Sequence, residues 1–90
     1  MKTIWKFPLR VTDSQRIEMP RGAEILTAQT QNGQGYLWAL VDPEAVDTEM
    51  RTIEIHGTGN PILEGNNRER RYVATFQQLA FVWHVFERID

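Results

Sequence analysis

Residues 29–41, QTQNGQGYLWALV, decide the fold class of this chain. At their centre, Asn32-Gly33 is the strongest turn signal in the sequence, because an Asn-Gly pair readily adopts the positive φ angles of a tight hairpin. The segment before the turn, 24–31, is β-prone and largely polar, whereas 36–41 is apolar on both faces. We therefore predict a strand on each side of the turn. The second strand is expected in the centre of a sheet or against another chain.

Alternation of apolar and polar residues, the period of a half-buried strand, recurs on both sides of this hairpin. Near the middle of the chain, Ile53 and Ile55 are predicted to point inward, while Glu54 and His56 form a solvated strand face. Strands are predicted at 3–7, 15–19, 24–31, 36–41, 51–56, 72–76 and 79–88, with loops at 43–49 and 64–71. This pattern predicts an all-β single domain over residues 1–90. The expected architecture is a small β-barrel or two-sheet sandwich of about seven short strands, with at most a single helical turn within the first loop.

The C-terminal segment 76–89 fits two structures. Its large apolar residues also stand at helical spacings, and Thr75 to Gln78 match a capping box. A helix would leave almost no polar face, however, and 81–86 is rich in β-branched and aromatic residues. We therefore favour a hairpin that turns at Gln77-Gln78.

Composition excludes several classes of protein. The chain has 90 residues and no cysteine, which excludes a disulfide framework and a thiolate metal site and fits a reducing compartment. Its formal net charge of -2 argues against binding to duplex nucleic acid. The N-terminal residues do not read as a signal peptide, and no stretch approaches the roughly 18 apolar residues of a membrane span. A cytoplasmic protein without membrane contact is expected.

The sequence offers little for catalysis. Its two histidines, His56 and His84, have no second metal-ligand type at a useful spacing, so neither a metal site nor a cofactor is predicted. His84 lies in an apolar run and is expected to be a core or interface residue. No Gly-x-Ser-x-Gly elbow, P-loop or cysteine nucleophile is present. We expect a binding protein and not an enzyme.

The loop Gly57-Thr58-Gly59-Asn60 is the first candidate for ligand binding. Two glycines flanking a threonine after a strand let backbone N–H groups converge into an anion-binding nest. A tight turn that needs positive φ angles accounts for the same residues.

Basic and aromatic residues complete the candidate site. Arg68, Arg70 and Arg71 form the densest basic run and could hold phosphate, although a solvated loop paired with Glu69 explains the run as well. Trp38 and Tyr72 could stack a base, with a place in the core as the alternative. His56, next to the glycine loop, is included in the candidate set.

Four acidic residues stand close together without an intervening base: Asp42, Glu44, Asp47 and Glu49. Such a run can mimic nucleic-acid phosphates toward a basic protein target. It also has the composition of an ordinary hydrated loop.

Four blocks of the sequence together resemble one family. They are MKTIWKFPL at 1–9, LWALVDP at 37–43, GTGNPI at 57–62 and VWHVFE at 82–87. With these blocks the chain resembles a family of short uncharacterised proteins from phages and prophages. The resemblance implies an accessory protein of a phage, acting in the host cytoplasm, and brings no catalytic residues with it.

These observations predict a non-enzymatic, phage-encoded binding protein. The favoured function is to counteract host immunity by sequestering an anionic nucleotide signal at the glycine loop and the arginines. One alternative is an inhibitor that docks on a host defence or nucleic-acid-binding protein through an acidic or apolar surface. A second alternative is a structural or assembly protein. Two strands apolar on both faces, 36–41 and 81–86, also predict a homo-oligomer.

Overall fold

The predicted Asn32-Gly33 hairpin is present in the computed structural model, which describes residues 1–62 and 69–89. Asn32 and Gly33 have φ angles of 54° and 79°, as a tight two-residue hairpin turn requires. The flanking strands pair in antiparallel register, with Gln31 opposite Gln34. This hairpin is therefore confirmed.

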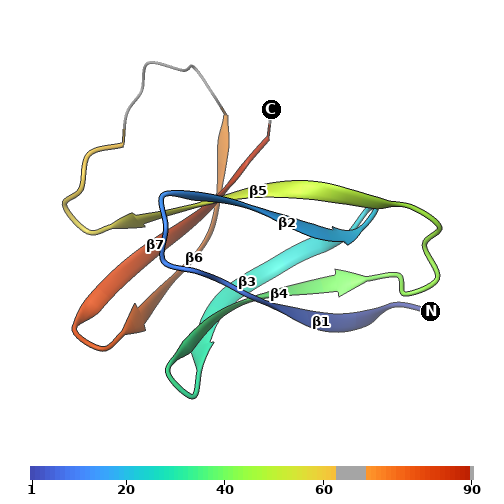
Figure 1. The fold of residues 1–90 in the computed structure, drawn as a ribbon, viewed down its shortest axis with the longest axis horizontal. Helices are drawn as coiled ribbons and strands as arrows, with labels where there is room; N and C mark the ends of the chain where they lie inside the picture. The colour runs from blue at the N-terminus through green and yellow to red at the C-terminus, as the bar shows by residue number, and fades with distance from the viewer. Residues whose placement is uncertain (63–68, 90) are drawn as a thin grey trace.

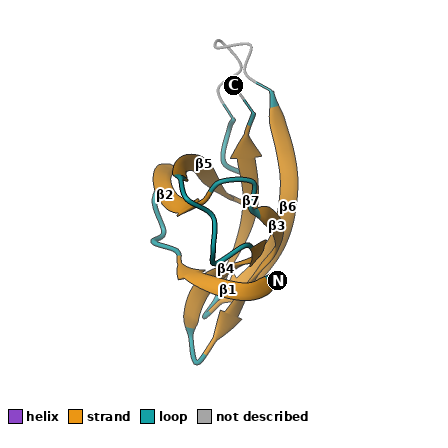
Figure 2. Ribbon diagram, turned by 90° about the vertical axis from the view of Figure 1, so that its right-hand side faces the viewer, coloured by secondary structure: helices purple, strands orange, loops and turns teal. Residues whose placement is uncertain are grey.

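Strands dominate the described residues. Seven are found there: β1 (Thr3–Pro8), β2 (Ser14–Pro20), β3 (Glu24–Gln31), β4 (Gln34–Val41), β5 (Thr48–Gly57), β6 (Arg70–Gln78) and β7 (Phe81–Arg88). They form two antiparallel sheets, in the orders β1-β4-β3 and β2-β5-β7-β6 (Figure 1). Figure 2 shows strands and loops but no helix in the described part of the chain, so no helix there could cross a membrane. The all-β prediction is confirmed. Of the two predicted architectures, the structure has two separate sheets, which do not close into a barrel.

The core lies between the sheets, and β4 shows how residues divide between core and surface. One set of its side chains is fully buried: Leu37, Ala39 and Val41. The other set, on the outer face of the three-stranded sheet, is partly exposed: Tyr36, Trp38 and Leu40. The four-stranded sheet contributes residues such as Ile53, Phe76 and Val85 to the same core. The apolar strand is thus central in its sheet, as predicted, with one face in the core.

The C-terminal segment is a hairpin, but its turn lies two residues later than predicted. β6 continues through Gln78, which pairs with Phe81, so Leu79 and Ala80 form the turn. Packing away from the turn sets this register, because it buries Phe76 and Val85 in the core. The predicted turn at Gln77-Gln78 is therefore wrong.

The last two residues of each predicted loop belong to strands. In the first, the Ala45 amide donates to the Asp42 carbonyl at 3.1 Å and closes a turn without forming a helix. Pairing with β2 draws Thr48 and Glu49 into β5. In the second predicted loop, 64–71, the first five residues lie outside the described part of the chain, and 70–71 belong to β6.

Candidate functional site

Among the predicted site residues that the structure describes, Trp38 lies on the other sheet. Trp38 lies on the outer face of the three-stranded sheet, where its ring centroid is 6.2 Å from that of Tyr36 and 5.9 Å from Lys6 Nζ. The described members of the predicted set other than Trp38 come from β5, the turn after it and β6, which all belong to the four-stranded sheet. Arg68 lies outside the described residues.

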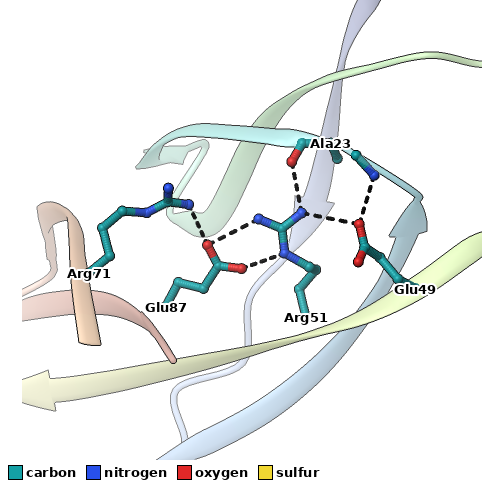
Figure 3. A network of polar contacts seen from close by, with 6 residues as sticks. Ala23, Glu49, Arg51, Arg71 and Glu87 are labelled. Carbon is teal, nitrogen blue, oxygen red and sulfur yellow. Dashed lines mark hydrogen bonds and ion pairs between the residues drawn. The ribbon is translucent and has the colours of Figure 1, made fainter. Parts of the chain in front are cut away.

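Arg71 contacts a buried carboxylate and not the glycine turn. Its Nη2 donates to Glu87 Oε1 at 2.5 Å, and Arg51 donates to the same carboxylate from Nε and Nη2 (Figure 3). Arg51 also donates from Nη1 to the Ala23 carbonyl at 2.7 Å. The hydrogen bonds to Glu87 raise the pKa of Arg51, although burial opposes the shift. Arg71 therefore has a structural partner on the core side of the sheet.

Arg70 reaches a second buried carboxylate, that of Glu54, because neighbouring residues of a strand point to opposite faces. Arg70 Nε donates to Glu54 Oε1 at 2.6 Å, and His56 Nε2 lies 2.9 Å from the same oxygen. Arg88 Nε lies 3.2 Å from Glu54 Oε2. Glu54 is only 5% exposed, so the expectation of a solvated strand face is wrong at this residue. Long side chains from β6 and β7 cover it.

The pKa of Glu54 predicts a pH dependence of stability. Burial raises this pKa, but hydrogen bonds from Arg70 and His56 outweigh burial and hold it below its ordinary value of 4.5. A carboxyl whose pKa is lowered on folding contributes stability above its unfolded pKa, and this stability is lost as the pH falls through the folded pKa. Glu54→Gln should lower the unfolding free energy at neutral pH by about 2–3 kcal/mol. It should also flatten the decline of stability below pH 4.5.

Urea unfolding across the acidic and neutral range measures both effects. Glu18, exposed on β2, provides the matched control. Glu18→Gln should change neither the stability at neutral pH nor its decline in acid. Identical pH profiles for the wild type and Glu54→Gln would contradict the prediction.

The segment Gly57-Thr58-Gly59-Asn60 forms a tight turn after β5. The Asn60 amide donates to the Gly57 carbonyl at 3.0 Å, and Gly59 has a φ of 86°, as the third residue of a type II turn requires. The Thr58 amide donates to the Val82 carbonyl at 3.4 Å. Two of the amides expected in an anion nest are thus engaged within the fold. The turn therefore presents the side chains of Thr58 and Asn60 as polar groups.

A cavity of about 410 Å³ brings several predicted site residues together. Its lining includes His56 from β5, Asn60 from the turn and Arg70 from β6. Asp13, on the segment before β2, lines it as well. The volume falls within the roughly 300–1,000 Å³ of small-molecule sites. The cavity therefore has the size and the polar groups to hold a small ligand.

Aromatic rings lie on the same face of the four-stranded sheet. The Phe86 ring contacts His56 and Tyr72 edge-on, with centroids 5.9 and 5.6 Å apart. A second cavity, of about 300 Å³, is lined by Phe86, His56 and the 57–60 turn. Tyr72 is 57% exposed, so its ring is accessible beside these groups.

His84 lies on this outer face and not in the core, and sequence reasoning did not include it in the site. Its Nδ1 is 3.0 Å from Thr75 Oγ1, and its Nε2 is 2.7 Å from Thr58 Oγ1. A hydroxyl–imidazole pair becomes a nucleophile when a third group, usually a carboxylate, orients the imidazole. Here the neutral Thr75 hydroxyl occupies that position.

The acidic run makes contacts within the chain. Glu49 Oε2 accepts a hydrogen bond from the Gly22 amide at 2.7 Å and lies 3.7 Å from Arg51 Nη1. Asp42 Oδ1 accepts one from the Glu44 amide at 3.0 Å. Within 1–62 and 69–89, no group of three or more histidine, aspartate or glutamate residues is placed to hold a metal ion.

The whole chain, residues 1–90, matches the family model described as a domain of unknown function, DUF7352, and the chain belongs to this family. No curated protein and no solved structure matches it. The family agrees with the resemblance to an uncharacterised group of proteins, and its description includes no phage origin.

Proposed function

We propose that this member of the DUF7352 family is a non-enzymatic binding protein that holds a small anionic ligand of nucleotide type beside the 57–60 turn. The observation that carries the proposal is the cavity lined jointly by His56, Asn60 and Arg70. These residues come from two strands and a turn, and side chains of their types are common donors to phosphate oxygens.

The mixed charge of the cavity supports a nucleotide over inorganic phosphate alone. Arg70 provides a guanidinium group beside a phosphate, while Asp13 and Glu54, the partner of Arg70, add carboxylates to the lining. A carboxylate repels phosphate but accepts hydrogen bonds from ribose hydroxyls and base amino groups. The rings of Phe86 and Tyr72 offer apolar contact to a base. A nucleotide carries a phosphate for the guanidinium, hydroxyl groups for the carboxylates and a base for the rings, all in one molecule.

The biological role follows from the phage setting that the sequence resemblance implies. There, a protein of this kind would sequester a nucleotide that signals infection and so counteract host immunity in the host cytoplasm. Docking on a host protein through the acidic run has less support, because Glu49 and Asp42 already accept hydrogen bonds within the chain. An assembly role would need only self-association and would leave the cavity without a function.

A thermal-shift panel of cyclic nucleotides, linear nucleotides and inorganic phosphate tests the proposal. At least one nucleotide should raise the melting temperature by several degrees. A ligand that binds only the folded state stabilises it by about 2.7 kcal/mol at a hundredfold excess over the Kd. Inorganic phosphate should give a much smaller shift. A flat response across the panel would overturn the proposal.

The variant Asn60→Asp places a negative charge in the cavity without changing the size of the side chain. It should weaken binding of the active nucleotide about tenfold or more through repulsion of the phosphate. Asn32→Asp adds the same charge at the β3–β4 turn, outside the cavity lining, and should bind like the wild type. Equal affinities for the two variants would contradict the placement of the site.

A further inference from the structure

The turn between β6 and β7 exposes an apolar side chain at an unfavourable backbone angle. Leu79 has a φ of 55° and is 87% exposed. A positive φ at the first central position of a two-residue hairpin suits glycine and is rare for a bulky residue. Neither the conformation nor the exposure of this leucine helps the isolated domain to fold. Such an outlier points to a role outside the fold.

Leu79 stands at the end of a larger apolar surface. Phe81 is 60% exposed and stacks on Trp83, with ring centroids 5.7 Å apart and planes 27° from parallel. Val82, next to it, is 37% exposed. A groove of about 470 Å³ lies between these residues and the 57–60 turn. We refer to Leu79, Ala80, Phe81, Val82 and Trp83 as the hairpin tip.

The charge of this hairpin indicates which partner suits it. Residues 72–86 contain no Asp, Glu, Lys or Arg, in a chain of which 24% is charged. In a two-fold dimer the same patch meets itself, so any charged residue near the axis would approach a like charge. This surface avoids that repulsion. Anionic lipid or nucleic acid would need basic residues, which residues 72–86 do not provide.

We propose that the hairpin tip is the surface through which two copies of this chain associate, with the leucine of each copy seated in the groove of the other. In a two-fold dimer, the exposed leucine of the first copy meets the groove of the second, and the leucine of the second meets the groove of the first. Burial of Leu79 and Phe81 in the dimer offsets the backbone cost of the turn. The proposal does not depend on the ligand site.

Leu79→Gly separates an association role from a folding role. Glycine suits the positive φ, so the dilute, monomeric variant should melt about 2–6 °C above the dilute wild type. The same change removes the anchor, so the dimer dissociation constant should rise about tenfold or more. Sedimentation velocity over a range of concentrations up to about 100 µM gives the dissociation constant.

Val46, which is 98% exposed in the loop between β4 and β5, provides the control. Val46→Ser should dimerise like the wild type, and Phe81→Gln should weaken the dimer as Leu79→Gly does. A wild-type mass of 10.5 kDa at every concentration would overturn the proposal. Unchanged dimerisation of Leu79→Gly would also overturn it, as would a melting temperature of dilute Leu79→Gly below that of the dilute wild type. Binding of the tip to phosphatidylcholine vesicles in place of a second copy would overturn it as well.

Discussion

Replacing Glu87 with leucine is expected to lower the free energy of unfolding by about 3–5 kcal/mol, the range for removing one partner of a buried ion pair. Glu87 is 5% exposed, and its carboxylate accepts hydrogen bonds from Arg51 and Arg71. Without it, the largely buried Arg51 guanidinium is left with Glu49, at 3.7 Å, as its charged neighbour. Urea unfolding followed by tryptophan fluorescence measures the loss.

A double replacement separates the cost of an unpaired charge from the cost of altered packing. Arg51→Met combined with Glu87→Leu should recover most of the stability, because no buried charge then lacks its partner. The exposed pair Arg21–Asp47, at 3.9 Å, provides the control. Asp47→Asn should change the unfolding free energy by less than about 0.5 kcal/mol. A Glu87→Leu effect no larger than this would contradict the assigned role of the network.

The arginine run shows what a local pattern leaves open. Sequence reasoning placed Arg70 and Arg71 in one loop as a joint phosphate site. In the structure they are neighbours on a strand, and their side chains reach Glu54 and Glu87 on opposite faces of the sheet. Each partner lies sixteen positions away in the chain. Strand pairing determines these partners, so a pattern within the run could not identify them.

The strands themselves were predictable because their signals are local. Alternation in β5 and the Asn32-Gly33 turn depend only on neighbouring residues. The position of the β6–β7 turn was not predictable from local sequence, because neither Gln77-Gln78 nor Leu79-Ala80 is a strong turn sequence. Core packing decides between them. His84 was not predicted as a site residue because it lies in an apolar run. Only the observed register places it opposite Thr75, its hydrogen-bond partner.

The candidate cavity was partly predictable for the same reason. His56 and the glycine turn are contiguous in sequence, so they were expected to act together. Arg70 joins them because β6 lies only one strand away from β5, on the other side of β7. The Arg70 side chain extends across β7 to Glu54 on β5. Asp13 enters from the segment before β2, which pairs with β5 from the other side. Sheet order, which the local sequence does not reveal, completes the site.

Phe76→Ala is the second large effect that we expect, a loss of about 3–5 kcal/mol in the free energy of unfolding. Phe76 is 3% exposed and extends from β6 of one sheet toward β4 of the other. Its ring fills the space above Gly35, where a Cβ would lie only 3.0 Å from Cζ and 3.2 Å from Cε2. Truncation removes this contact between the sheets and leaves a cavity. Urea unfolding of Phe76→Ala beside the wild type measures the cost, and a loss below about 1 kcal/mol would show that the ring does not connect the sheets.

A substitution at Gly35 tests the same contact with Phe76. Gly35→Ala should cost about 1–3 kcal/mol, because the buried ring has little room to move. Phe76→Leu lacks the two atoms that the new methyl group would approach, so Gly35→Ala should cost less in that background, with a coupling of at least about 0.5 kcal/mol. Gly33→Ala is the control, since its cost arises from a φ of 79° and its Cβ would have no atom within 4 Å. That cost should be the same in both backgrounds. If Gly35→Ala is equally costly with leucine or phenylalanine at position 76, the ring does not set the glycine requirement.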